Sequence, residues 1–596
     1  MTKPEKEEVR NRVRMLRDDM RQNGIDILVL SSTDPHASEY VPEYYKVTEY
    51  FSGCTSDNAV LVIEDNAARL WTDGRYFISA ASELEGTGIA LMKMRQPSVP
   101  TVTDYLRTNL VKNMKLGFDG RCVKASFGME LRKIADSNGA EVVSTYAPAD
   151  HLWVGRPALP VKEAYVLGEE LIGTPFSDKL ARVRARVSEF GASYHVLSKL
   201  DDIMWLFNIR GSDVPCNPVA LSFALIGPDT VDLFIRKEAV SPATERYFRE
   251  NRVKLHSYES VYTYLEEYHF EGSVLADSSD SSDAICALIK EKTTVIDGRN
   301  PTLYLKGEKD AVEIGHIRRV YVEDSAAVCR FIYSIKQKAG KEKFTEYTAA
   351  RKIDGLRRCI PGFLDISFPT ISAYGPNAAM PHYAMTQDDC SVVSPDGFLL
   401  VDSGGQYMGG TTDVTRTIVV GPLTDEMKRD FTLVAAANLR LMYSKFPEGT
   451  TGIQLDMLAR EVLFEHGLDY DHGTGHGIGF ILNVHEGPHS LSRSVKPGSA
   501  SLEGIRRNMI VSDEPGVYRE GRYGIRTESI LLCEDDETTE FGHFLKFAPL
   551  TFAPIDLDAI DPRYLEPSDV KRLNRYHKEV RDVISPFLKG EELEWL

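Results

Sequence analysis

The hydrophobic pattern near the N-terminus predicts a helix followed by a buried strand. Four apolar residues recur at the three- and four-residue spacing of a helix face: Val9, Val13, Leu16 and Met20. Gly24 follows where such a helix would end, because glycine readily takes the left-handed backbone conformation of a helix C-terminus. The apolar run at residues 25–31 then predicts a buried strand.

The same pattern returns later in the chain. Four residues stand 167 positions after their counterparts Val13, Leu16, Met20 and Gly24: Leu180, Val183, Val187 and Gly191. Residues 58–75 and 222–237 continue the two copies, each as strand, turn and strand. Helix, glycine and strand also follow one another by chance in α/β proteins, but the constant offset favours a duplication. We therefore predict two related α/β domains at residues 1–152 and 153–315.

The rest of the chain predicts a third, larger α/β domain and an extension. Helical periodicity covers residues 313–339, 345–359, 425–446 and 453–467, with strand patterns between the two pairs. This domain is predicted at residues 316–535. Residues 536–596 mix strand and helix patterns and end on apolar Trp595 and Leu596, so we expect this extension to pack on the third domain.

Composition and charge narrow the class of protein. The length of 596 residues exceeds a single core at roughly 100 to 200 residues per domain. The formal net charge of -18 argues against a broad surface for nucleic acid or for an anionic membrane. The eight cysteines are scattered without a CxxC pair, as in a reducing compartment, so we predict a cytoplasmic location. The sequence shows neither the apolar segment of a signal peptide nor an apolar run of ~20 residues, so we expect neither export nor a membrane span.

Two strand pairs carry the candidate chemistry. Residues 398–420 predict a hairpin whose strands each bear one aspartate, Asp402 and Asp413. Residues 508–533 place Glu514 at the end of one strand and Glu528 inside the next. Facing side chains on paired strands lie about 5 Å apart, which suits carboxylates that share metal ions. Without cations, four such carboxylates would repel one another and at least one would stay protonated.

A glycine-rich stretch at residues 471–480 supplies two histidines. His472 and His476 are four residues apart, but the alternating glycines disfavour a helix by about 1 kcal/mol each. An extended backbone puts both histidines on one side, and the missing side chains allow close approach to a crowded site. One histidine can complete a metal-ligand set while the other faces substrate. A phosphate loop is the alternative, but neither GxxxxGK[ST] nor GxGxxG fits this stretch.

Together these motifs resemble the pita-bread metallopeptidases, specifically the three-domain, cytosolic-type aminopeptidases P. The order Asp, Asp, His, Glu, Glu and the stretches at residues 72–77, 200–219, 375–383 and 485–488 are similar to that family's landmarks. The resemblance implies a fold that is α/β and α+β. Two creatinase-like α/β N-terminal domains (1–152 and 153–315) would be followed by a pita-bread catalytic domain (316–535) and a C-terminal extension (536–596).

The resemblance also assigns roles to the metal-binding residues. Five residues are expected to hold two divalent ions: Asp402, Asp413, His476, Glu514 and Glu528. Asp413 and Glu528 would bridge both ions, and Glu514 would also handle the proton of the attacking water. Four oxygen ligands and one nitrogen, without sulfur, favour a hard ion such as Mn²⁺ over zinc. The resemblance points to manganese as well.

Further residues are expected around the substrate. By the same resemblance, His382 and His485 would bind substrate and stabilise the tetrahedral intermediate, so they count with Glu514 as catalytic. His472 and Phe368 would border a proline pocket, and Arg75 would reach the site from the first domain. Arg526, two residues before Glu528, would order the carboxylates.

The predicted function is a metallo-aminopeptidase, a hydrolase that cleaves the N-terminal X-Pro bond of peptides with proline second. The resemblance further implies a homodimer. A prolidase-type X-Pro dipeptidase is the alternative within the class, although prolidases usually carry one N-terminal domain. A non-catalytic pita-bread binding protein or a metal-free creatinase-like hydrolase would lack ligands that this chain retains. Neither a GxSxG nor an HExxH motif supports another hydrolase class.

Overall fold

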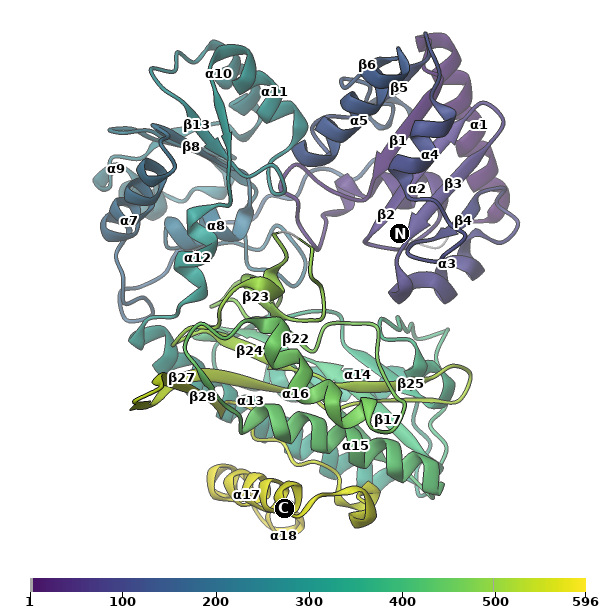
Figure 1. The fold of residues 1–596 in the computed structure, drawn as a ribbon, viewed down its shortest axis with the longest axis vertical. Coiled ribbons are helices and arrows are strands. Elements are labelled where there is room, and N and C mark those ends of the chain that lie inside the picture. The colour runs from purple at the N-terminus through teal and green to yellow at the C-terminus, as the bar shows by residue number, and fades with distance from the viewer. Residues whose placement is uncertain (1–3, 497) are drawn as a thin grey trace. The chain divides into compact units, whose positions relative to one another are not determined.

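The computed structural model describes residues 4–496 and 498–596, and the chain forms two compact units. The N-terminal unit comprises Met1–Leu167, Pro175–Pro215 and Val219–Thr302. The C-terminal unit comprises Gly168–Thr174, Cys216–Pro218 and Leu303–Leu596. Each unit is described by itself below, with the element labels of Figure 1.

The first half of the N-terminal unit is a six-stranded sheet covered by helices. Helix α1 (Lys6–Asn23) buries the four predicted apolar residues and ends at Gly24, whose φ of 65° is left-handed. The strand order is β4-β3-β2-β1-β5-β6. The strands are β1 (Ile27–Ser31), β2 (Ala59–Glu64), β3 (Ala68–Thr72), β4 (Ala90–Lys93), β5 (Lys115–Gly117) and β6 (Glu141–Val143). The helices after α1 are α2 (Val47–Ser52), α3 (Phe77–Leu84), α4 (Val102–Asn109), α5 (Ala125–Asn138) and α6 (Ala149–Leu152).

The second half repeats this sheet strand for strand. Its order is β12-β11-β10-β8-β13-β14, and each neighbouring pair is parallel or antiparallel as in the first sheet. The strands are β8 (Tyr194–Leu197), β10 (Ser222–Ile226), β11 (Val231–Ile235), β12 (Lys254–His256), β13 (Val274–Ala276) and β14 (Val295–Asp297). Helix α7 (Phe176–Glu189) precedes β8, with Gly191 at φ 73° between them. The duplication predicted from the constant offset is therefore confirmed in the topology.

The remaining elements of the N-terminal unit are short helices and one small ladder. The helices are α8 (Leu200–Leu206), α9 (Pro242–Glu250), α10 (Val261–Glu267) and α11 (Asp283–Lys292). Strands β7 (Tyr165–Val166) and β9 (Ile209–Arg210) pair with each other. The two halves meet at α5 and α11, where Arg132 donates a hydrogen bond of 2.7 Å to Asp283.

Long helices frame the C-terminal unit at the predicted places. They are α13 (Ala311–Lys338), α14 (Glu346–Arg358), α15 (Asp425–Met442) and α16 (Gly452–Phe464). Helix α17 (Pro567–Ile584) and the five-residue helix α18 (Glu591–Trp595) follow in the C-terminal extension. Thr345 caps α14, since its side chain accepts from the backbone N–H of Thr348. Trp595 and Leu596 pack against the hydrophobic core of this unit, as expected for the extension.

Several small sheets and one larger sheet complete the C-terminal unit (Figure 1). The ladders are β16-β17-β20, β15-β18-β19, β25-β26 and the six-stranded β21-β28-β27-β24-β22-β23. Their strands are β15 (Phe363–Ile366), β16 (Ile371–Tyr374), β17 (Phe398–Ser403), β18 (Gly405–Tyr407), β19 (Gly410–Thr411), β20 (Val414–Val419), β21 (Lys445–Pro447), β22 (Gly475–Gly477), β23 (Glu486–Leu491), β24 (Ile510–Asp513), β25 (Gly516–Arg519), β26 (Tyr523–Arg526), β27 (Ser529–Thr539) and β28 (Gly542–Pro549).

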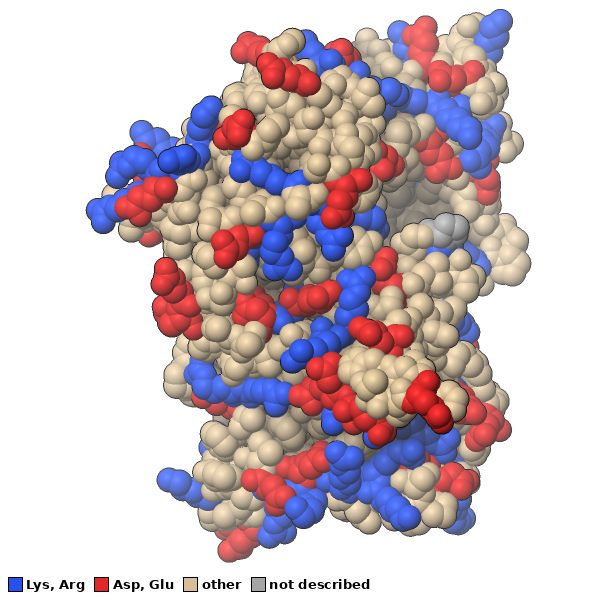
Figure 2. All heavy atoms as spheres, turned by 60° about the vertical axis from the view of Figure 1, so that its left-hand side comes forward, with Lys and Arg blue, Asp and Glu red and all other residues tan. Residues whose placement is uncertain are grey.

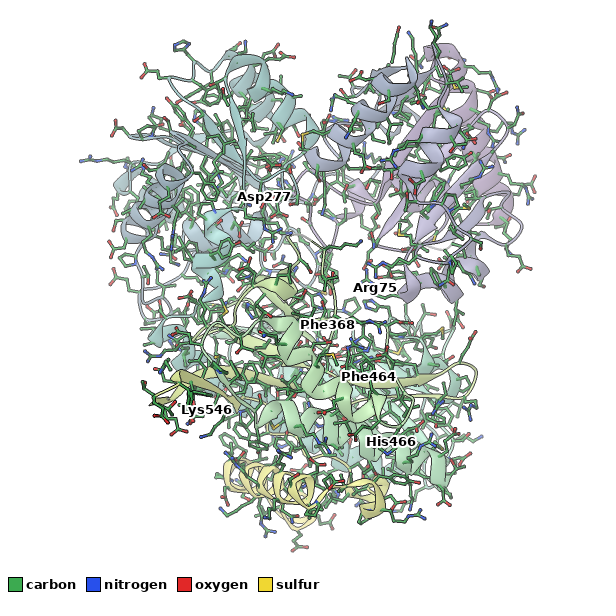
Figure 3. The ribbon with its side chains drawn as sticks, viewed as in Figure 1. Arg75, Asp277, Phe368, Phe464, His466 and Lys546 are labelled. Atoms are coloured by element: carbon green, nitrogen blue, oxygen red, sulfur yellow. The ribbon has the colours of Figure 1, made fainter. Side chains whose placement is uncertain are left out.

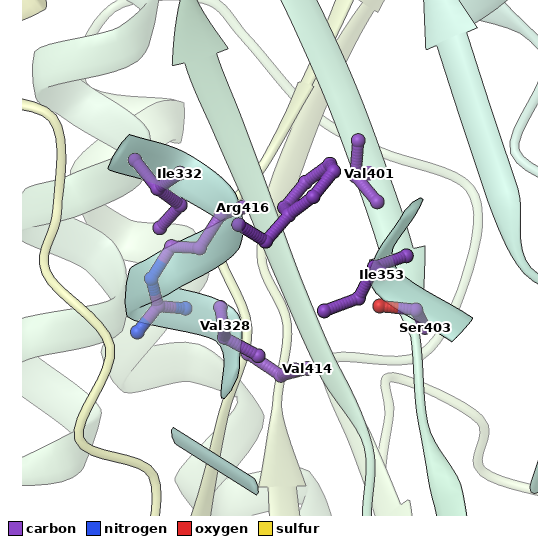
Figure 4. A pocket seen from close by; sticks show the side chains of 8 residues that line it. Val328, Ile332, Ile353, Val401, Ser403, Val414 and Arg416 are labelled. Atoms are coloured by element: carbon purple, nitrogen blue, oxygen red, sulfur yellow. The ribbon is translucent and has the colours of Figure 1, made fainter. Parts of the chain in front are cut away.

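Strands β17 and β20 are supported from behind by α13 and α14. Side chains from these four elements enclose a cavity of about 10 Å³, drawn in Figure 4. It is lined by Val328, Phe331, Ile332, Ile353, Val401, Ser403, Val414 and Arg416. A space of this size holds one water molecule at most, so the packing behind these strands is tight. Side chains on the opposite face of the strands are thereby held in place.

Charge is distributed without large separation on the face drawn in Figure 2. Acidic and basic side chains alternate over it rather than gathering by sign.

None of the helices among the described residues combines the length and the apolar character that crossing a bilayer requires.

Candidate functional site

The four predicted carboxylates sit at the ends of strands in the C-terminal unit. Asp402 lies in β17, and the antiparallel register pairs it with Thr415 of β20. Asp413 immediately precedes β20, Glu514 immediately follows β24, and Glu528 immediately precedes β27. The expectation that Asp413 and Glu528 lie within strands is therefore wrong. Both residues stand one position before their strand begins. Their side chains are therefore not bound to the alternation of the strand and can face the other carboxylates.

His476 joins this cluster from strand β22. Its backbone is extended, as the alternating glycines predict, and its Nε2 lies 3.6 Å from Asp413 Oδ2 and 3.5 Å from Glu514 Oε1. One ligand atom each from Asp413, His476 and Glu528 fall within 4.8 Å of one another. A Cβ atom on Gly475 would lie 1.9 Å from the carbonyl oxygen of Ser512. The glycine therefore allows β22 to approach β24 closely, as the sequence pattern suggests.

Burial and mutual repulsion disturb the ionisation of the carboxylates. Burial first, and then the charges of Glu528, Asp402 and Glu514, raise the pKa of Asp413 well above its usual value. The pKa of Glu514 is raised well above its usual value for the same kinds of reason, burial and the charge of Glu528. Burial and the charge of Asp402 raise the pKa of Glu528 to about 7. Four anions in a buried site thus oppose one another in the absence of a compensating cation.

The donor set fits divalent metal ions. Asp402 Oδ1, Asp413 Oδ1 and Glu528 Oε1 are buried and lack a hydrogen-bond donor among the described residues. Buried carboxylate oxygens are normally satisfied by hydrogen bonds or cations. Four carboxylates and one imidazole offer hard oxygen and nitrogen ligands for two divalent ions.

The raised pKa values predict the pH dependence of metal-free protein. Asp413, Glu514 and Glu528 bind protons more tightly in the folded than in the unfolded chain, so stability is gained as pH falls through their folded pKa values. Between pH 8 and pH 6 we expect chelator-treated protein to gain on the order of 1 kcal/mol per pH unit. Thermal unfolding across this range is the measurement. Protein saturated with Mn²⁺ is the control and should lose stability as protons displace the ions; equal slopes in both samples would contradict the prediction.

Arg526 and Tyr518 connect this cluster to His472. Arg526 donates hydrogen bonds to Asp402 Oδ2 and, at 2.9 Å, to the Tyr518 hydroxyl, while His472 Nε2 lies 2.8 Å from the same hydroxyl. Burial, followed by the charge of Arg526, lowers the pKa of His472 to about 3, so this imidazole is neutral near pH 7. Tyr518 is not among the site residues that the sequence predicted. Its position four residues after Glu514 was the available signal.

The predicted substrate residues fall into three groups. His485 packs edge-on against His476, with ring centroids 4.3 Å apart, and His382 is near enough to His472 for its charge to lower that residue's pKa further. Phe368 is buried, lies in the segment that joins β15 to β16, and is labelled in Figure 3. Arg75 belongs to the N-terminal unit, where its guanidinium donates to both carboxylate oxygens of Asp73 at 3.0 and 2.9 Å. Its predicted contact with substrate stays a prediction.

Four family models match successive parts of this chain. The family model described as metallopeptidase family M24 matches residues 315–535, and the C-terminal region of peptidase M24 matches residues 543–596. Two models of the creatinase/prolidase N-terminal domain match residues 12–152 and 155–313.

Individual proteins match over nearly the whole chain. A probable Xaa-Pro aminopeptidase P of Coprinopsis cinerea is 36% identical over 606 residues, which cover 98% of this chain and 96% of the relative. The crystal structure of the X-prolyl aminopeptidase from Caenorhabditis elegans, described as a cytosolic enzyme with a di-nuclear active site, is 32% identical. It superimposes with a TM-score of 0.92 over 99% of this chain and 98% of its own. A prolidase from Thermococcus sibiricus is 23% identical, has a TM-score of 0.51 and covers 64% of this chain and 99% of its own, a likeness of fold alone.

Proposed function

Because this chain belongs to metallopeptidase family M24, with creatinase-type N-terminal domains, we propose that it is an Xaa-Pro aminopeptidase. It hydrolyses the bond between the first residue of a peptide and a proline in second position. The observation that carries this proposal is the cluster of four carboxylates and His476, in which Asp413 and Glu528 are buried and three carboxylate oxygens lack a hydrogen-bond donor among the described residues. The aminopeptidase P relatives, similar over the whole chain, favour the X-Pro specificity.

Five residues are proposed to hold two divalent ions: Asp402, Asp413, His476, Glu514 and Glu528. When bound, such ions neutralise the clustered carboxylates, lower the pKa of a water and act as Lewis acids toward the scissile carbonyl. Manganese is the proposed metal, since the ligands are hard oxygen donors and one imidazole. The relatives' family and the di-nuclear site of the Caenorhabditis elegans enzyme support two ions.

The protein's own groups bind, orient and move protons. Glu514, which accepts a hydrogen bond of 3.3 Å from Ser512 and faces His476, is proposed to take the proton of the attacking water. Its pKa is raised by burial and by the charge of Glu528, which favours proton uptake. His382 and His485 are proposed to hold the substrate and the oxygen of the tetrahedral intermediate.

The other proposed contacts are with the substrate's proline and with the carboxylates. His472 and Phe368 are proposed to border the proline pocket, where a neutral imidazole places no charge against an apolar ring. Arg526 orients Asp402 through its guanidinium. Arg75 of the N-terminal unit remains the proposed additional substrate contact.

A peptide assay tests the reaction. Chelator-treated protein should regain release of arginine from Arg-Pro-Pro when Mn²⁺ is restored, by more than about 10²-fold over the metal-free sample. Arg-Ala-Ala is the control peptide and should be cleaved far more slowly. Cleavage of the dipeptide Arg-Pro but not of Arg-Pro-Pro would instead identify a prolidase. Folded, metal-loaded protein that cleaves neither peptide would refute the proposal.

The homodimer and the cytoplasmic location also remain proposals. The eight cysteines are free, which supports a reducing compartment. The homodimer follows from the family resemblance, and light scattering coupled to size-exclusion chromatography would measure it.

A further inference from the structure

The segment that carries His382 runs from the end of β16 to residue 391. It begins with a short 3-10 helix at Gly375–Ala379 and contains little other regular structure before β17. An irregular segment of this length does not by itself hold a side chain in one position. The proposed role of His382 therefore requires that other contacts fix the segment.

Glu346 makes those contacts. This first residue of α14 is fully buried, and its carboxylate accepts from the backbone N–H groups of Tyr374 and Ser391, both at 2.6 Å. It also accepts from Asn377 Nδ2 at 3.0 and 3.2 Å and from the Tyr383 hydroxyl at 2.8 Å. One carboxylate thus joins the start, the middle and the end of the segment, and one of its donors is the neighbour of His382.

The groups that contact the Glu346 carboxylate are hydrogen-bond donors. All four donor residues present N–H or O–H groups, and a carboxylate is the side chain that accepts at every position. Glu346 also lies at the N-terminus of a 13-residue helix, where the helix dipole favours negative charge. A glutamine has the same shape, but its amide NH₂ would face donors instead of acceptors. The segment would have to move to relieve that conflict.

The segment also packs against β26, the strand that carries Arg526. A Cβ atom on Gly524 of β26 would lie 1.7 Å from the carbonyl oxygen of Ala378, so the 3-10 helix sits directly on the backbone of this strand. Arg526, at the end of β26, bonds to Asp402. The segment that Glu346 holds therefore also contacts β26, and Arg526 of that strand donates a hydrogen bond to Asp402 of the carboxylate cluster.

We propose that Glu346 is a positioning residue for His382, holding it at the metal centre by closing residues 374–391 around a buried carboxylate. The inference rests on the proposed function, because it assigns Glu346 a role through a residue of that reaction. A displacement of about 1 Å of a substrate-contacting group lowers turnover by roughly 10²-fold.

A double-mutant cycle tests the inference. With Arg-Pro-Pro as substrate, Glu346→Gln should lower kcat by about 10- to 100-fold, with KM changed less and with bound metal unchanged. In the His382→Ala background the same substitution should change kcat by less than about 3-fold, since the group it positions is absent. Glu342→Gln, four residues earlier and 62% exposed, is the matched control and should leave kcat unchanged.

The outcomes separate this inference from the proposed function. Multiplicative effects of Glu346→Gln and His382→Ala would overturn the positioning role, as would full activity of His382→Ala. If Glu346→Gln fails to fold, Tyr383→Phe removes one donor beside His382 and the same cycle applies. If the wild-type protein cleaves no X-Pro peptide, hydrogen exchange still tests whether Glu346 holds this segment. In Glu346→Gln the backbone amides of residues 374–391 should lose protection, whereas those of residues 398–419 should keep it. Unchanged exchange in 374–391 would overturn the inference without reference to activity.

Discussion

Replacing Asp413 with asparagine is expected to lower kcat/KM for Arg-Pro-Pro by at least about 10³-fold, more than the 10- to 100-fold typical of losing a partner outside the ligand set. Asp413 is 4% exposed, its Oδ1 lacks a hydrogen-bond donor among the described residues, and its Oδ2 faces His476. Asparagine keeps the shape but removes the charge that would be shared between two cations. Bound metal per chain should fall below two, as measured by elemental analysis alongside the kinetics.

The same variant should become more stable in the absence of metal. Because burial and the charge of Glu528 raise the pKa of Asp413, its anionic form destabilises the metal-free protein. Asp413→Asn should therefore raise the unfolding temperature of chelator-treated protein while lowering the stabilisation that Mn²⁺ provides. Asp471→Asn is the control: that side chain lies beside His472 in sequence, is fully exposed and should alter activity by less than about 2-fold. Two bound ions and more than a tenth of wild-type activity in Asp413→Asn would contradict the proposed ligand role.

The second large effect is expected on stability, from a buried ion pair behind the site. Arg357 Nε and Nη2 donate to the two oxygens of Asp324 at 2.8 and 3.1 Å, and both side chains are almost completely buried. Arg357 also donates to the carbonyl of Ser403, and the Tyr407 hydroxyl donates to Asp324 at 2.6 Å. Arg357→Met would leave Asp324 as an uncompensated buried anion. We expect the free energy of unfolding to fall by about 3 to 5 kcal/mol.

Denaturant unfolding of the C-terminal unit measures this loss. Arg507→Met removes an exposed partner of Asp535 in the same unit, at 3.0 Å, and should change the free energy of unfolding by only about 0 to 1 kcal/mol. Adding Asp324→Leu to Arg357→Met should restore part of the stability, because the unpaired charge is then removed. A loss below about 1 kcal/mol for Arg357→Met alone would show that water or another group compensates Asp324.

Local periodicity accounts for the part of the fold that was predictable. The apolar spacing from Val9 to Met20 and the glycine at position 24 reflect the geometry of one helix and its end, which neighbouring residues determine. The constant offset then indicated the second copy, and the two sheets share one strand order. Likewise, the number and kinds of carboxylates and histidines indicated metal chemistry, because few other arrangements tolerate so many acidic groups together.

Strand ends and registers were harder to predict. The hairpin with Asp402 was expected to have Asp413 in its second strand, whereas Thr415 is the residue paired with Asp402 and Asp413 precedes β20. A shift of one residue in the register of a strand moves each side chain to the other face of the sheet. The register depends on the partner strand, so the residue types alone do not fix it.

The sequence by itself determined the duplicated α/β architecture, the family resemblance and the residue types of the metal cluster, since these depend on short-range periodicity and on side-chain chemistry. The tertiary structure alone decided that Tyr518 links Arg526 to His472, that Arg357 neutralises Asp324, and that Glu346 gathers its donors from residues 374–391. Except for the bond between Arg526 and Tyr518, which are eight residues apart, these contacts join residues that are tens of positions apart, and none of them leaves a periodic signal. They form only when the packed backbone brings a buried charge to its donors, and they then become obligatory because a buried polar group without a partner is strongly unfavourable.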